Sequence, residues 1–240
     1  MRVDLPRNLF DLEKRPAFTK DLKSVRTDIE DLVIQGETKN LDLLSTFTNL
    51  TKLWIYTVNQ QQFENIISLI QPKQLHIYEM RVSDLSPLES LHNLEVVSLQ
   101  WNTKATSLWD LGQNPKLYSL AIMDFPKLQS LDALQTQPDI HVLELHGGIW
   151  NSLTIPTLEP LRKLVNLRHL TLMNIRVKDE SLEPIADLHQ LEELSISNQF
   201  PTQEYARLSV KLANANCELF HPYILLESPI EDKDIMVVGK

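Results

Sequence analysis

Four side chains of the types that bind metal ions occur in the middle of the chain. His141, Glu144 and His146 are near neighbours, and His169 follows further along. Imidazole nitrogens and carboxylates are zinc ligands, but zinc enzymes place them in patterns such as His-Glu-x-x-His. No such spacing occurs in this sequence. We therefore interpret the four as solvated polar residues on an open face and predict that the protein has no metal site.

Two other features resemble reactive sites. Cys217 is the single cysteine and occupies a position where leucine is expected, so it is interpreted as a small hydrophobic residue. Gly147-Gly148 is followed by no Lys-Ser or Lys-Thr pair, so a phosphate-binding loop is not indicated. Because no set of nucleophile, base and orienting residue is visible, we predict that the protein is not an enzyme and needs no cofactor.

A recurring apolar triplet runs through most of the chain. Each copy has an apolar residue, two variable residues, a second apolar residue, one variable residue and a third apolar residue. The copies are Ile29/Leu32/Ile34, Leu50/Leu53/Ile55, Pro72/Leu75/Ile77, Leu94/Val97/Leu99, Leu117/Leu120/Ile122, Ile140/Leu143/Leu145, Leu167/Leu170/Leu172, Leu191/Leu194/Ile196 and, more weakly, Asn214/Cys217/Leu219. Successive copies start 21 to 27 residues apart, which is the period of a solenoid built from short repeats.

Apolar residues at three-residue intervals precede most of the triplets, for example Leu85, Leu88 and Leu91. Period three predicts a 3₁₀ or short α-helical return segment with one buried face. In the fifth and sixth copies, Asn114 and Gln137 replace the third apolar residue. A single unit cannot bury its apolar face, so the units must stack. The sequence thus predicts an α/β solenoid with a curved parallel sheet on its concave side and short helical or 3₁₀ returns on its convex side.

The stretch from Asp84 to Leu94, Asp-Leu-Ser-Pro-Leu-Glu-Ser-Leu-His-Asn-Leu, resembles the leucine-rich-repeat family, and most closely its bacterial internalin-type subclass. Residues 158–161 and 182–188 repeat the same phrase, and the resemblance covers about residues 29–219. It implies a binding scaffold. The asparagine that the family places eight residues after the first leucine occurs only as Asn102, while Asn174 and Asn198 lie one place early. Irregular turns after the strands are therefore expected.

Five aromatic side chains are predicted to form the partner-binding site. The residues between the apolar positions of each triplet face outward on the concave side of the sheet. In the second to fourth strands these outward positions hold Trp54, Tyr56, His76 and Tyr78, with Trp101 close by. Tyrosine and tryptophan are enriched at binding hot spots. The alternative interpretation is that these wide rings fill the inner curve and shield one another.

Composition limits the classes of partner. The chain has 42% hydrophobic and 23% charged residues, as expected for a soluble globular protein. Its 32 acidic and 23 basic residues give a formal net charge of −9, which disfavours nucleic acid as a partner. The single cysteine, and the absence of an apolar leader after Met1, favour a cytoplasmic location. A monomer that does not associate with membranes is expected.

We predict one leucine-rich-repeat domain over residues 1–240, with an N-terminal cap at 1–28, about nine repeats at 29–219 and a C-terminal cap or tail at 220–240. The sixth unit is 27 residues long, and its extra residues around 147–151 are expected to bulge as a loop. The favoured function is a protein–protein interaction scaffold that binds another protein through the concave face. The alternative is a small-molecule or glycan receptor that uses the aromatic group. A flat aromatic platform would favour the first and a deep slot the second.

Overall fold

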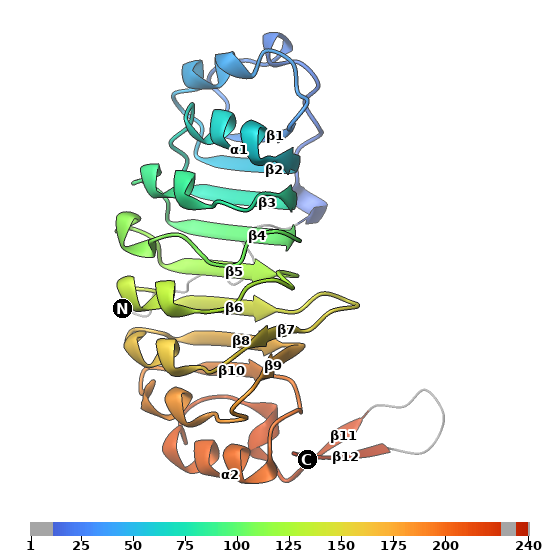
Figure 1. The fold of residues 1–240 in the computed structure, drawn as a ribbon, viewed down its shortest axis with the longest axis vertical. Helices are drawn as coiled ribbons and strands as arrows, with labels where there is room; N and C mark the ends of the chain where they lie inside the picture. Colours follow the sequence, from blue (N-terminus) through green and yellow to red (C-terminus); the bar gives the residue numbers. More distant parts are fainter. Residues whose placement is uncertain (1–11, 227–233, 240) are drawn as a thin grey trace.

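The computed structural model describes residues 12–226 and 234–239. Its main element is an eight-stranded parallel sheet in the order β1-β2-β3-β4-β5-β6-β8-β10 (Figure 1). The sheet strands are β1 (Asp31–Gln35), β2 (Lys52–Asn59), β3 (Gln74–Arg81), β4 (Val96–Asn102), β5 (Ser119–Met123), β6 (Val142–His146), β8 (His169–Met173) and β10 (Glu193–Ile196). All eight strands end at the same side of the sheet, which we name the carboxyl edge (Figure 1).

The return segments are short helices packed on one face of the sheet (Figure 1). Two are α-helices, α1 (Gln60–Ile67) and α2 (Thr202–Lys211). The 3₁₀ helices of the described chain are Leu12–Lys14, Leu22–Ser24, Leu41–Thr46, Ser86–Ser90, Leu111–Gln113, Asp132–Thr136, Glu159–Lys163, Glu183–Asp187 and Glu218–Phe220. The predicted α/β solenoid, with its parallel sheet and its mixture of 3₁₀ and short α-helical returns, is therefore confirmed.

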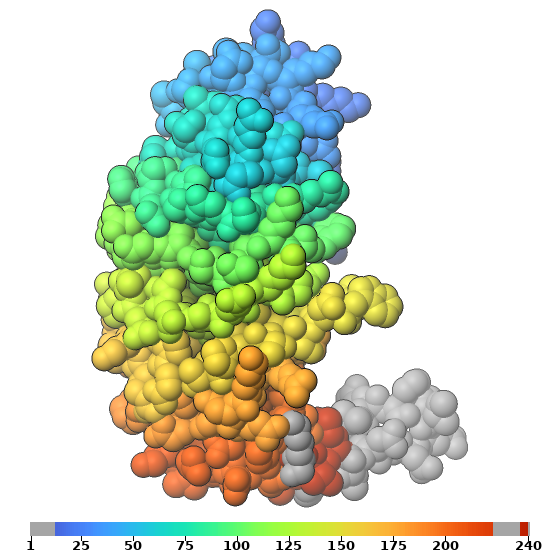
Figure 2. Space-filling model, in the orientation of Figure 1, coloured from blue at the N-terminus to red at the C-terminus, as the bar shows by residue number. Residues whose placement is uncertain are grey.

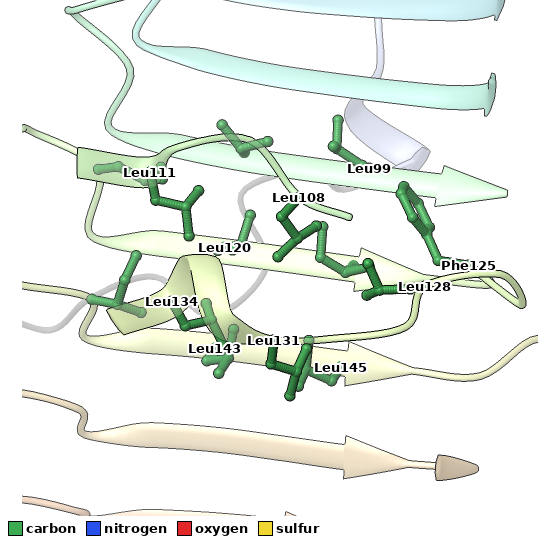
Figure 3. Packing of buried hydrophobic residues seen from close by; sticks show 14 of the residues in the cluster. Leu99, Leu108, Leu111, Leu120, Phe125, Leu128, Leu131, Leu134, Leu143 and Leu145 are labelled. Carbon is green, nitrogen blue, oxygen red and sulfur yellow. The ribbon is translucent and has the colours of Figure 1, made fainter. Parts of the chain in front are cut away.

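The apolar triplets align in register across the sheet. Leu53 pairs with Leu75, and the row continues through the equivalent residue of each strand to Leu194. The third positions form a parallel row that includes Leu99 and Leu145, and both rows are almost fully buried (Figure 3). Each such leucine contributes about 1.5–3 kcal/mol through burial. The first eight predicted triplets are therefore the strands of the sheet. The ninth forms only a single bridge between Asn216 and Glu193.

Polar residues at two apolar positions of the return segments are accommodated by hydrogen bonds. Asn114 is fully buried, and its Nδ2 donates to the carbonyl oxygens of Leu88 (2.9 Å) and Leu91 (3.0 Å). Its Oδ1 accepts from the indole Nε1 of Trp109 at 2.5 Å. Gln137 in the next unit donates to the carbonyl oxygen of Asn114 at 2.7 Å. Each polar group therefore satisfies backbone groups of the preceding unit, which removes the cost of burying them unpaired.

The three asparagines near the strand ends have different roles. Asn102 is buried, donates to the carbonyl oxygen of Val82 (2.9 Å) and accepts from the backbone of Lys104 (2.8 Å), so it links two successive turns. Asn174 has a left-handed backbone with φ of 50°, and its side chain bonds to the loop at 147–152. Asn198 donates to the carbonyl oxygen of Val237 at 2.8 Å. The two asparagines that lie one place early therefore bind inserted or terminal segments.

Two small sheets lie outside the main one. The strands β7 (Leu153–Ile155) and β9 (Ile175–Val177) pair in parallel just beyond the carboxyl edge. The antiparallel pair β11 (Tyr223–Leu226) and β12 (Asp234–Val237) projects from the last unit (Figure 1). None of the helices in the described ranges is both long and apolar enough to span a bilayer.

The N-terminal segment packs over the first repeat. Thr19 donates to the carbonyl oxygen of Val33 at 2.9 Å, and Asp21 forms a parallel bridge with Lys39. Leu22 is buried in the core. The remainder of the predicted N-terminal cap, residues 1–11, and residues 227–233 of the predicted C-terminal cap or tail lie outside the described residues.

Candidate binding surface at the carboxyl edge

Two of the five predicted site residues are buried, so the expectation that they would be exposed is wrong. Trp54 is 1% exposed and His76 is 2% exposed. The indole Nε1 of Trp54 donates to Oδ1 of Asp31 at 2.9 Å, and its ring lies 5.1 Å from that of His76. The Lys52 ammonium lies 4.9 Å from the Trp54 ring. These rings do face the concave side, but the side chains around them exclude solvent.

His76 is held as a neutral ring within this layer. Its Nδ1 lies 3.1 Å from Oγ of Ser98 on β4. Burial, together with the positive charges of Lys52 and Arg15, lowers the pKa of His76 to about 4. The ring therefore acts as a packed polar contact between β3 and β4 at neutral pH.

Tyr56 lies between the buried rings and the surface. Its ring is half-buried and contacts Phe18 of the N-terminal segment at a centroid distance of 4.9 Å. The guanidinium of Arg15 lies 4.2 Å from the Phe18 ring and 5.2 Å from the Tyr56 ring. Burial raises the pKa of the Tyr56 phenol. The segment from Arg15 to Phe18 thus covers part of the aromatic group that the sequence predicted to be open.

Tyr78 and Trp101 remain accessible, and we name them the edge pair. Tyr78 is 36% and Trp101 is 42% exposed, with ring centroids 5.7 Å apart. Trp101 has a φ of 56°, in the left-handed region that bulky residues rarely occupy. Thr57, Glu79 and Asp124 have the same conformation near the ends of their strands. Trp101 is therefore held at the surface by a turn that recurs between units, at a cost in backbone strain.

The exposed large apolar side chains of the described chain gather along the carboxyl edge. Phe18 contacts Tyr56, and Val165 and Val210 lie on other parts of the surface. The others occur near strand ends or on segments bound there: Tyr78, Trp101, Ile149, Trp150, Met173 and Val237. Exposed apolar side chains that gather on one part of a surface mark interaction sites, so this edge is the strongest candidate for an interaction surface.

A hollow of about 490 Å³ lies on the concave side of the last repeats. Its walls include Glu144, Thr171 and Glu193 from three strands, together with Met236 from β12. The volume is within the range of small-molecule sites. Cys217 also contributes to its lining but is buried, and burial raises the pKa of its thiol. The reactive thiolate is therefore disfavoured.

The residues weighed as metal ligands are only partly brought together. Nε2 of His146 lies 3.5 Å from Oε2 of Glu144 on the same strand. His169 is paired with Val142 in the sheet. Over residues 12–226 and 234–239, no group of three or more His, Cys, Asp or Glu side chains is arranged to hold a metal ion.

Comparison with solved structures places this architecture in a known fold. An internalin from Listeria monocytogenes matches with a TM-score of 0.50 and 16% identity, over 77% of this chain and 66% of that one, just under two thirds. The fold is a leucine-rich-repeat solenoid. The predicted resemblance to internalin-type proteins is thereby confirmed at the level of the fold.

Weaker matches include internalin C2 from the same bacterium, with a TM-score of 0.42, 16% identity, and coverage of 71% of this chain and 77% of that one. Another is the leucine-rich-repeat ectodomain of the Arabidopsis thaliana receptor kinase GASSHO1/SCHENGEN3, with a TM-score of 0.43, 14% identity, and coverage of 77% and 25%. No family model matches the sequence. No curated protein matches it either.

Ile149 and Trp150 are the surface residues that sequence reasoning missed in this leucine-rich-repeat chain. The long sixth unit predicted a loop at 147–151, and the structure has one there, but no role was inferred for its side chains. The signal was the placement of two large apolar residues within an insertion. Residues that are extra to the repeat have no position in its core, so their side chains remain in solvent unless another surface covers them.

Proposed function

We propose that this chain is a leucine-rich-repeat scaffold that binds a protein partner at the carboxyl edge of its concave face. The single observation that carries the proposal is the edge pair. Tyr78 and Trp101 are exposed, in contact with each other, and fixed to a hydrogen-bonded sheet. Binding at such a surface loses little conformational entropy, because the rings are already ordered.

The buried members of the aromatic group support the edge pair from below. Tyr56 contacts both His76 (5.9 Å) and Tyr78 (5.6 Å), so a continuous series of rings runs from Trp54 to Trp101. In this proposal Trp54 and His76 position the exposed rings and do not touch the partner. The net charge of −9 favours a partner with a neutral or basic surface.

The strained backbone of Trp101 supplies a test that separates binding from stability. In the double variant Tyr78→Ser/Trp101→Asn, asparagine tolerates the left-handed conformation better than tryptophan. The unfolding temperature should therefore stay close to that of the wild type, or rise. Affinity for a partner captured from the source cell and then purified should fall about 30-fold for each ring, as expected for hot-spot residues.

Val210→Ser is the matched control, since it removes an exposed apolar residue from helix α2, away from the edge. It should bind the partner as the wild type does. Unchanged affinity in the Tyr78→Ser/Trp101→Asn variant would contradict the proposed role of the edge pair.

A small-molecule or glycan receptor is the second candidate, and the hollow near β6, β8 and β10 is the observation that favours it. Its polar walls, which include Glu144, Thr171 and Glu193, offer acceptors for sugar hydroxyl groups. A glycan array probed with the wild type and with Thr171→Trp, which fills the hollow, tests this candidate. Binding that the Thr171→Trp variant loses would support the receptor function.

A further inference from the structure

The loop at residues 147–152 carries the two most exposed large apolar side chains among the described residues. Ile149 is 89% and Trp150 is 91% exposed. The loop joins β6 to β7 and projects from the body of the solenoid beyond the carboxyl edge (Figures 1 and 2). An isolated tryptophan in water leaves a large apolar area uncovered, which is costly unless another surface covers it.

The base of this loop is fixed by hydrogen bonds. Gly147 donates to the carbonyl oxygen of Met173 at 2.9 Å, and Gly148 donates to that of Asn151 at 2.7 Å. Asn174 donates from Nδ2 to the carbonyl oxygen of Gly148 (2.6 Å) and accepts at Oδ1 from the hydroxyl of Ser152 (2.7 Å). The tip is therefore presented in a defined geometry, which lowers the entropic cost of binding through it.

Both glycines at the base are required by close contacts. A side chain at Gly147 would collide with the backbone carbonyl of Asn174, and one at Gly148 would collide with the carboxylate of Asp124. Within the described part of the chain, the Asp124 carboxylate has no hydrogen-bond or ion-pair partner. Partial burial raises its pKa. The loop thus combines an apolar tip with an uncompensated negative charge at its base.

We propose that the loop is a docking plug, in which Ile149 and Trp150 enter an apolar pocket on a protein partner and a lysine or arginine at the pocket's rim pairs with Asp124. This inference rests on the proposed function and adds a second contact on the same edge. Both surfaces lie at the carboxyl edge, the edge pair on β3 and β4 and the loop after β6.

Charge favours a protein pocket over two other surfaces that could cover the loop, a lipid bilayer and a second copy of this chain. A loop that inserts into a bilayer gains affinity from flanking lysines or arginines. Residues 128–161 of this chain contain neither, and the net charge of −9 opposes an anionic surface. The same net charge disfavours a second copy of this chain as the occupant, because two such copies repel each other.

The central test measures the affinity of the purified partner for the wild type and for Ile149→Ser/Trp150→Ser by calorimetry. Removing both anchors should weaken binding by about 100-fold or more. Asp124→Asn should weaken it by up to about fivefold at low salt and reduce its salt dependence. Val210→Ser, which lies away from the edge, is again the control. Wild-type affinity in the loop variant would overturn the proposal.

Trp150 itself reports on the contact. Of the four tryptophans, Trp54 and Trp109 are buried, Trp101 is 42% exposed and Trp150 is 91% exposed. Acrylamide should quench a large part of the fluorescence of the free protein, and the partner should protect it. In Trp150→Ser the protected fraction should fall to the part that Trp101 contributes, and in Trp101→Asn the part that Trp150 contributes should remain. If the partner leaves quenching of the wild type unchanged, Trp150 does not enter a pocket.

Two further measurements test whether the loop binds a lipid bilayer or a second copy of this chain instead. The chain is sedimented with vesicles of phosphatidylcholine and phosphatidylserine, and its own mass is followed by sedimentation equilibrium. We expect no pelleting with vesicles and a monomer at all concentrations. Vesicle binding or dimerisation that Ile149→Ser/Trp150→Ser abolishes would assign the plug to a membrane or a second copy and overturn the protein pocket.

The edge-pair variant and the loop variant together distinguish failure of this inference from failure of the proposed function. If Tyr78→Ser/Trp101→Asn binds normally and the loop variant does not, the plug stands and the role of the edge pair fails. The reverse result rejects the plug alone. If no captured protein depends on either surface, both proposals are wrong.

Discussion

The two halves of the concave face share one backbone pattern but have opposite surfaces. In the central outward position of the strands, Trp54, His76 and Ser98 in β2, β3 and β4 are buried, whereas Ser195 in β10 is exposed. In the first half large rings contact one another, and Arg15 and Phe18 pack against the ring of Tyr56. In the second half Thr171, Ser195 and their neighbours line a hollow of about 490 Å³. Ser98 and Ser195 have the same side chain, so the side chains that surround this position, rather than the fold, decide whether the face is closed or open there.

The closed half should be far more sensitive to truncation at this position, and this is the largest effect we expect. Trp54→Ala should lower the free energy of unfolding by about 3–5 kcal/mol, because it removes a buried ring and its hydrogen bond to Asp31. Ser195→Ala, at the equivalent position of the open half, should change it by less than about 0.5 kcal/mol. Urea denaturation of both variants gives the comparison, and similar losses would show that the two halves do not differ in this way.

The core beneath the two halves should not differ. Leu99→Ala in β4 and Leu172→Ala in β8 each remove a fully buried side chain from the same row of the sheet. Each should cost about 2–5 kcal/mol, because each leaves a cavity. Chemical unfolding should give values within about 1 kcal/mol of each other if the repeats are equally packed. A much smaller loss at Leu172 would locate the difference in the core instead of on the concave surface.

Titration of His76 should make the closed half sensitive to acid. The pKa is about 4 in the folded chain, below the ordinary value of 6.5, so the unfolded chain binds the proton first as the pH falls. Stability is therefore fully present above pH 6.5 and should decrease by about 3 kcal/mol as the pH falls from 6.5 to 4. The pH profile of unfolding measures this loss. His76→Gln should lack that part of the profile, and an identical profile in this variant would exclude His76 as its cause.

The repeat register could be read from the sequence because it depends on a short-range rule applied many times. Apolar residues two apart point to the same side of a strand, and a nearly constant period places each strand beside the next. These two regularities locate Leu53, Leu99 and Leu172 in the buried rows before any coordinates are known. The 3₁₀ returns follow from the period of three in the same way.

The exposure of the candidate site depended on contacts that no local rule describes. Trp54 and Tyr78 both occupy outward positions, but Trp54 is 1% exposed, in contact with Lys52 and His76, while Tyr78 is 36% exposed. The left-handed backbone of Trp101, near the end of β4, is likewise not predicted by any local rule.

The sequence by itself determined the solenoid, its period and the identity of the buried rows, because each repeat states the same pattern again. The tertiary structure alone decided which rings are covered, that Asn174 fixes the loop at 147–152, and that Ile149 and Trp150 extend into solvent beyond the edge. The physical reason is that burial is a sum over neighbours distant in the chain. Residues 23 or more positions apart, such as Asp31 and Trp54 or Gly148 and Asn174, meet only after the units have stacked.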